Sequence, residues 1–202
     1  MTLQLTRANL TSVVFTRFFV APPPRVWAAH MEPDLIRQWL LGPDGWAMPV
    51  CENDPRHGGK VRHEWRNGST GASFGLIATY ELIEAPHRSI HIEQMLLPEP
   101  TPESRVETRF DPEGSGNRMT MTMTVADPAT MEAMLATGMA GGMETGYARW
   151  RLCWAGGVKA GGLCPPLALQ GHSPPGILAA KKCKRNNRAA CQAVRPSGSG
   201  RP

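Results

Sequence analysis

Residues 118–152 read RMTMTMTVADPATMEAMLATGMAGGMETGYARWRL, and this stretch decides the fold. Methionines at positions 119, 121 and 123 alternate with threonines, which predicts a strand over 118–126 with one apolar face. Asp127 is a good N-cap residue and Pro128 a good first helical residue. Apolar residues then recur every three or four positions, which predicts one helix over 128–152, about 37 Å long at about 1.5 Å per residue.

The residues before this stretch predict one strand, two short helices and five more strands. Residues 11–20 are rich in Val, Phe and Thr and end at three prolines, after which 25–30 and 32–40 have helical character. Turn residues then separate extended segments at 46–52, 60–66, 74–84, 89–97 and 105–110. The predicted fold class is therefore α+β, with a curved seven-stranded antiparallel sheet wrapped round a long C-terminal helix and two short helices after the first strand.

The terminal helix is the only predicted element long enough to bury one face of that sheet. Because the curvature of a sheet and the radius of a helix do not match, we expect a gap between them, either filled by large side chains or left as a cavity. Gly138, Gly141 and Gly142 weaken the helix by about 1 kcal/mol each relative to alanine. Glycines in a packed helix usually allow another element to come close.

The composition changes sharply near residue 152. All 17 Asp and Glu and 14 of the 22 Lys and Arg lie before residue 153, so residues 1–152 have a net charge of −3 and the rest +8. We therefore predict a domain over 11–152 and a basic, Gly- and Pro-rich, disordered tail over 153–202. Three hypotheses account for the tail, namely a frameshift product, disorder without function, and an arm attracted to nucleic acid or anionic lipid.

The domain itself shows no basis for several functional classes. Its net negative charge makes nucleic acid an unexpected partner, and no apolar run approaches the roughly 20 residues of a membrane span. Residues 1–10 lack the apolar stretch of a secretory signal, and Cys51 is the domain's only cysteine, so we expect a cytoplasmic location. The spacing of His87 and His91 gives no third ligand, so we expect no metal, and no phosphate-binding motif indicates a cofactor.

Four groups of residues resemble one known family. They are Ala21–Trp27, Pro33–Trp39, Gly58–Arg62 and the glycine-containing segment from Thr137 to Arg149. In this order they resemble the START-like (SRPBCC) superfamily, and within it the proteins similar to the C-terminal domain of the activator of the heat shock protein 90 ATPase. The resemblance runs from about Thr11 to Arg149. It implies the helix-grip fold and a hydrophobic cavity between sheet and long helix, and its members include ligand carriers, polyketide cyclases and co-chaperone domains.

The candidate site is this cavity. Methionines dominate the last strand and the helix, and Met can mould to varied apolar shapes, although a stripe at helical spacing is also typical of ordinary core. On the strand over 60–66, Val61, His63 and Trp65 share one face. The predicted lining is Trp39, Trp46, His63, Trp65, Tyr80, Met119, Met121, Met139, Met143 and Tyr147.

The leading hypothesis is binding of an apolar small molecule such as a lipid or polyketide, with no catalysis by this chain. A second hypothesis is a protein-interaction module that acts on a chaperone through an exposed surface. A third is cyclase or hydrolase activity with His63 as general base, where Glu93 could pair with it. A satisfied core histidine is the simpler interpretation of His63.

Overall fold

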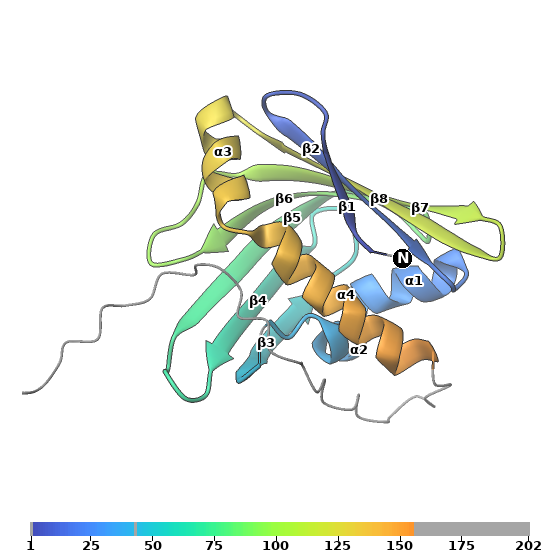
Figure 1. Cartoon of the computed structure of the whole chain (residues 1–202), viewed down its shortest axis with the longest axis horizontal. Helices are drawn as coiled ribbons and strands as arrows, with labels where there is room; N and C mark the ends of the chain where they lie inside the picture. Colours follow the sequence, from blue (N-terminus) through green and yellow to red (C-terminus); the bar gives the residue numbers. More distant parts are fainter. Residues whose placement is uncertain (1, 43, 156–202) are drawn as a thin grey trace, which may run out of the picture.

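The structure, a computed structural model, describes residues 2–42 and 44–155. Its strands are β1 (Gln4–Arg7), β2 (Ser12–Phe19), β3 (Trp46–Asn53), β4 (Lys60–Asn67), β5 (Ser73–Glu84), β6 (Arg88–Leu96), β7 (Ser104–Glu113) and β8 (Gly116–Val125). The helices are α1 (Pro23–Met31), α2 (Pro33–Trp39), α3 (Pro128–Ala136) and α4 (Met139–Ala155). The strands form one antiparallel sheet in the order β1-β2-β8-β7-β6-β5-β4-β3, and α4 crosses its concave face (Figure 1).

The α+β class and the order of elements are as predicted, with one additional strand. β1 pairs with β2 from Gln4 opposite Thr16 to Arg7 opposite Val13, which makes eight strands instead of seven. All four residues of β1 are exposed, so its sequence has no apolar alternation from which a strand could be predicted. The seven predicted strands and the two short helices lie within a few residues of their predicted bounds.

The prediction of one continuous helix over 128–152 is wrong. The chain leaves the helical path at Thr137 and Gly138, and Gly138 has a φ of 74°, in the left-handed region that favours glycine. Helix α3 begins as predicted, with the side chain of Asp127 accepting a hydrogen bond from the amide of Thr130 at 2.9 Å. The roof over the sheet is therefore two helices joined at one glycine.

Close approach of another element to α4 occurs at Gly146 and not at the glycines expected. A Cβ on Gly146 would lie 3.3 Å from the carbonyl oxygen of Trp39, at the end of α2. A Cβ on Gly141 or Gly142 would meet no atom within 4 Å. Gly146 therefore lets α4 lie directly against α2.

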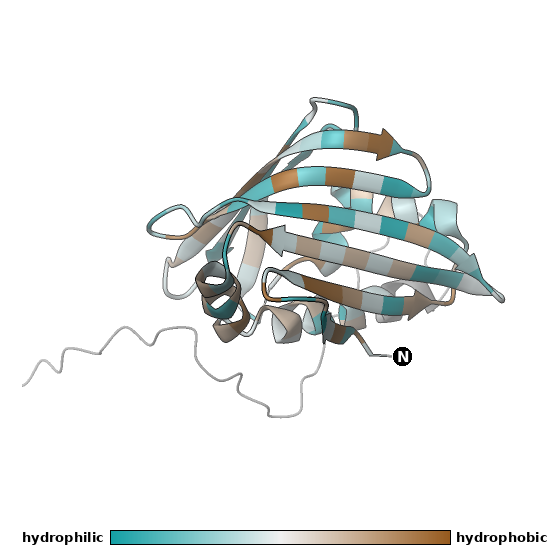
Figure 2. Ribbon diagram, turned by 90° about the horizontal axis from the view of Figure 1, so that it is seen from above, coloured by the Kyte–Doolittle hydropathy of each residue, from teal (hydrophilic) through white to brown (hydrophobic). Residues whose placement is uncertain are grey.

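The two faces of the sheet differ as the strand alternation requires, and the alternation is visible along the strands in Figure 2. Val13, Phe15, Val106 and Met123 face α3 and α4 and are almost fully buried. Arg17 shares this face, although it is charged, and only 4% of its surface is exposed. Its guanidinium is ion-paired with the carboxylate of Glu144 on α4, and that carboxylate also accepts a hydrogen bond from the amide of Leu3 at 2.7 Å.

Residues 153–155 continue α4, and the rest of the predicted tail lies outside the described residues. Within the described part of the chain, none of the helices combines the length and the apolar character needed to cross a bilayer. The cytoplasmic location stays a prediction.

Candidate functional site

An aromatic cluster fills the space between the sheet and the C-terminal half of α4. The rings of Trp39 and Tyr147 stack with centroids 4.9 Å apart, and those of Phe19 and Trp150 lie 4.0 Å apart. The indole N–H of Trp39 donates to the carbonyl of Ala29 at 2.9 Å. These aromatic rings are almost fully buried, so this half of the interior is closed by the protein's own side chains.

His30 belongs to the same cluster, and its pKa reflects how far water is excluded from it. Its Nδ1 is 2.7 Å from the carbonyl oxygen of Val26, and its ring lies 5.1 Å from the rings of both Trp39 and Phe110. Burial lowers the pKa of His30 from its ordinary value of 6.5 to about 4. Three predicted lining residues, Trp39, Met119 and Tyr147, are therefore part of a packed aromatic core, where the hydroxyl of Tyr147 donates to the sulfur of Met119 at 3.3 Å.

The methionines near the start of α4 are covered less completely. Met121 on β8 and Met143 on α4 pack against both the aromatic cluster and the cluster beneath α3, and each keeps part of its surface exposed. Met139 is also half-buried beside the second cluster. On the same face of the sheet, Leu76 and Met95 are paired across β5 and β6 and are likewise half-buried. The roof therefore leaves this part of the concave face incompletely covered.

Polar side chains share the face next to these apolar ones. The Nε2 of His91 and a carboxylate oxygen of Glu93 are 3.1 Å apart, and the ring of Tyr80 stands perpendicular to that of His91 at 5.7 Å. The hydroxyl of Tyr80 donates to Oδ1 of Asn53 at 2.8 Å, and burial raises the pKa of this hydroxyl to about 12. His63 faces inward and is 7% exposed.

The ring of His63 is held neutral. Burial lowers its pKa to about 4, with Glu93 acting in the opposite direction. Cys51 is its partner across β3 and β4, which raises the question of a Cys–His nucleophile. Burial raises the pKa of the Cys51 thiol to about 11, and its sulfur lies 3.7 Å from the carbonyl oxygen of Pro33. Since the reactive form of cysteine is the thiolate, Cys51 is an inert buried thiol here.

Trp46 and Trp65, two other predicted lining residues, lie at the β3 end of the sheet. The ring of Trp65 stacks on that of Phe74 at 4.7 Å, and its indole N–H donates to the carbonyl of Leu40 at 2.7 Å. The ring centroids of Trp46 and Phe74 lie 5.1 Å apart. The ten predicted residues thus fall into separate groups, and the half-buried methionines with His63 and Tyr80 are the ones near the incompletely covered face.

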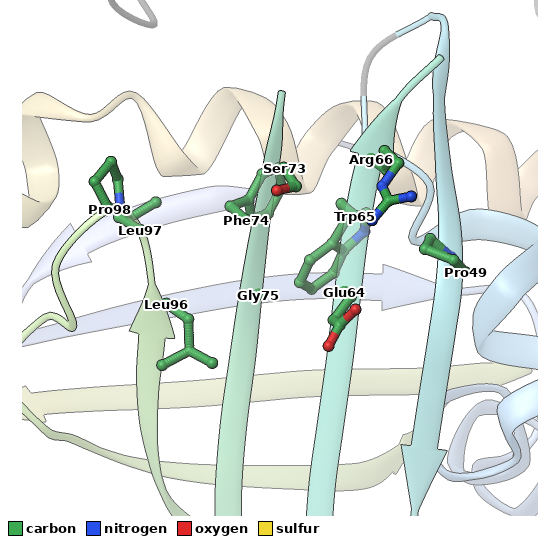
Figure 3. Close-up of a pocket in the computed structure, with 10 residues that line it drawn as sticks. All are labelled: Pro49, Glu64, Trp65, Arg66, Ser73, Phe74, Gly75, Leu96, Leu97 and Pro98. Carbon is green, nitrogen blue, oxygen red and sulfur yellow. The ribbon is translucent and has the colours of Figure 1, made fainter. Parts of the chain in front are cut away.

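A pocket on the outer face was not predicted. It has a volume of about 370 Å³ and lies over β4, β5 and the end of β6 (Figure 3). Glu64, Gly75 and Leu96 are register partners in adjacent strands, so Gly75 forms the floor between two side chains. A glycine inside a strand is the signal that could have located it. The lining residues are Pro49, Glu64, Trp65, Arg66, Ser73, Phe74, Gly75, Leu96, Leu97 and Pro98.

Two other residues near the concave face were missed because their neighbours lie on other elements, with Tyr80 on β5 beside His91 and Glu144 on α4 beside Arg17. His91 was considered only as a metal ligand, and the buried Arg17 was not considered at all. Within residues 2–42 and 44–155, no group of three or more His, Cys, Asp or Glu side chains is placed to hold a metal ion.

Comparison with known proteins identifies one family that this chain matches. The model of the family described as activator of Hsp90 ATPase homolog 1-like protein matches residues 20–150. A solved structure from Rhodobacter sphaeroides is 32% identical with a TM-score of 0.72, covering 77% of this chain and 99% of its own. The AHSA1-like protein from Aeromonas hydrophila is 21% identical with a TM-score of 0.55, covering 73% and 96%. Protein Ms6760 from Mycobacterium smegmatis is 21% identical with a TM-score of 0.63, covering 72% and 93%. No curated protein matches the chain.

Proposed function

The chain belongs to the family of activator of Hsp90 ATPase homolog 1-like proteins, as its motifs predicted, and from this premise we propose that it binds an apolar small molecule without catalysing a reaction. The family supports a ligand-binding helix-grip domain in general terms. The proposed site is the part of the concave face between β5, β6 and β8 and the first half of α4, which we call the open face. It comprises Leu76, Met95, Met121, Met139 and Met143.

The observation that carries the proposal is the uneven burial of side chains that point the same way. Val106 and Met119 on β7 and β8 are at most 1% exposed. Met121 lies two residues from Met119 on the same face of β8, yet keeps part of its surface accessible. Protein interiors are close-packed, so apolar side chains that face the interior and stay accessible favour a site that takes up a ligand.

The chemistry of the open face favours an adaptable apolar ligand. Four of its five residues are methionines, and three of these four come from β8 and α4. Methionine has three rotatable bonds and a polarisable sulfur, which lets one surface fit ligands of different shape. Burial of apolar ligand surface stabilises the complex by about 25 cal/mol per Å² of area removed from water, before the costs of association.

Binding is tested with a fluorescent hydrophobic dye, anilinonaphthalene sulfonate, and with decanol as competitor. We expect saturable dye fluorescence that decanol reverses, and a decrease of tenfold or more in dye affinity when Met143→Trp fills the open face. Leu10→Trp, at a 65% exposed position, is the matched control and should bind as the unaltered protein does. Absence of saturable binding, or equal binding by both variants, would contradict the proposal.

A second candidate function is stimulation of the Hsp90 ATPase, which the family description names. The outer pocket favours it, because it is open to solvent, carries Glu64 and Arg66 at its rim and adjoins Leu97, which is 42% exposed. The test is the ATPase rate of Hsp90 with this protein in excess. A rise that Arg66→Glu abolishes would support this function, whereas an unchanged rate would exclude it.

A further inference from the structure

Two ring nitrogens on the concave face are buried without a hydrogen-bond partner. They are Nε2 of His63 on β4 and Nδ1 of His91 on β6, and no described residue offers either of them a polar atom. Buried polar groups are nearly always hydrogen-bonded, so each unpaired atom requires an explanation. His63 is 93% buried, which places its free nitrogen inside the fold and away from bulk water.

The partner of His91 decides what its free nitrogen can do. A carboxylate only accepts hydrogen bonds, so the Nε2 of His91 donates to Glu93 across their 3.1 Å contact. In the neutral ring the lone pair is then on Nδ1, which makes this atom an acceptor. The carboxylate fixes the tautomer of the imidazole, and the free nitrogen therefore needs a group that donates.

The position of these atoms connects them to the open face. His91 lies opposite Tyr80, and Glu93 opposite Ala78, in the same inward-facing set as the pair Leu76 and Met95. The side chains of His91 and Glu93 keep 19% and 15% of their surface exposed, although Nδ1 of His91 is itself buried. His63 lies opposite Leu76 across β4 and β5, which places it on the same inward face.

We propose that the ligand of the open face is an apolar molecule with a hydroxyl group, alcoholic or phenolic, that donates a hydrogen bond to Nδ1 of His91. His63 supplies the second polar contact through Nε2. This inference rests on the proposed function and specifies the ligand class for the same site. A hydroxyl both donates and accepts, so it satisfies a ring nitrogen in either role.

Charge disfavours an anionic head group at this position. The carboxylate of Glu93 would repel a fatty-acid carboxylate. His63 offers no compensating positive charge, because burial keeps its pKa at about 4 and its ring neutral near pH 7. A neutral hydroxyl avoids the repulsion and still forms the hydrogen bond. The ligand is therefore expected to be an alcohol or phenol and not an acid.

The test compares para-propylphenol with its methyl ether, para-propylanisole, which has the same apolar body but no donor. We expect the phenol to bind at least tenfold more tightly to the unaltered protein. With His91→Phe this advantage should fall below twofold while the anisole keeps its affinity. His87→Phe, at an exposed histidine, is the matched control and should keep the full preference.

A second measurement keeps the test decisive if His91→Phe fails to fold. The imidazole nitrogen resonances of the unaltered, nitrogen-labelled protein should change at His91 Nδ1 on addition of the phenol and not of the anisole. Equal affinities for the two compounds, or no change at His91, would overturn the hydroxyl preference and leave the apolar site in place. Failure of both compounds and of the dye to bind would overturn the proposed function itself.

Discussion

The guanidinium of Arg17 on β2 is buried against the helix roof and is ion-paired with Glu144 on α4. It also lies over the rings of Phe19 and Tyr147, at 5.7 Å and 5.2 Å from their centroids. The charged group is therefore enclosed by one carboxylate and two aromatic faces. This pair joins β2 to α4 at the boundary between the aromatic cluster and the open face.

Removing Glu144 should destabilise the protein strongly. Glu144→Ala leaves the Arg17 charge buried without its carboxylate, for which the expected loss in the free energy of unfolding is about 3 kcal/mol. The amide of Leu3 loses its acceptor as well. Urea denaturation measures the change. The control is Glu132→Ala, which breaks an exposed pair with Arg7 and should cost under about 1 kcal/mol. Equal losses in the two variants would show that the buried pair has no special role.

Two glycine-to-alanine changes in α4 should have opposite effects. Gly146→Ala places a Cβ 3.3 Å from the Trp39 carbonyl oxygen, and Trp39 is held by its bond to Ala29 and by its stacking on Tyr147, so the contact has little room to relax. We expect a loss of about 1–3 kcal/mol from overpacking. Gly142→Ala meets no atom within 4 Å and should gain about 0.5 kcal/mol from helix propensity. Thermal unfolding of both variants decides, and a stabilised Gly146→Ala would contradict the close approach of α4 to α2.

The break between α3 and α4 should depend on glycine. Gly138→Ala forces an L-residue to a φ of 74°, for which we expect a loss of about 1–2 kcal/mol. Gly138→Asn should lose less, since asparagine adopts this region more readily. Chemical denaturation of both variants tests the order. If alanine were tolerated as well as asparagine, the two helices would be able to join into one.

Acid should destabilise the protein through His30 and His63. The pKa values of His30 and His63 are lowered from 6.5 to about 4, so between these values the unfolded chain binds protons that the folded chain does not. Stability is therefore complete above pH 6.5 and falls as the pH decreases, by about 1.4 kcal/mol per pH unit for each histidine. The free energy of unfolding from urea titrations between pH 5 and 6.5 measures this slope.

A single substitution should reduce the pH dependence of the free energy of unfolding. His63→Gln is expected to remove the contribution of His63 and to leave that of His30. Exposed His87→Gln is the control and should leave the slope unchanged. A slope that His63→Gln does not alter would mean that His63 takes up its proton equally in the folded and unfolded chain.

The side chains that share one face of a strand could be predicted from the sequence, whereas their partners could not. Alternation on β4 was sufficient to place His63 on the same face as Val61 and Trp65, because a period of two needs no knowledge of neighbouring strands. The pairing of His91 with Tyr80 depends on the register of β5 and β6 and is followed by an irregularity before Leu82. A local pattern cannot specify that register, so the polar group on the concave face emerged only from the structure.

The break between α3 and α4 could not be predicted from the sequence either, for a different reason. The apolar spacing continues from Met131 through Met143 to Trp150, so the pattern alone predicts one helix. The positive φ of Gly138 interrupts the backbone without interrupting that spacing. The stacking of Trp39 on Tyr147 likewise depends on the missing Cβ of Gly146, a tertiary contact between residues far apart in the chain.

The junction at Gly138 also determines how much of the roof must move for the interior to be reached. Helix α3 is nine residues long and holds Met131 and Met134 over the sheet, whereas the aromatic cluster is fastened to α4. Swinging α3 aside about this junction would uncover the apolar cluster beneath it while Tyr147 and Trp150 stay seated. Entry of a ligand at this end therefore requires movement of α3 alone, and the rest of the fold stays in place.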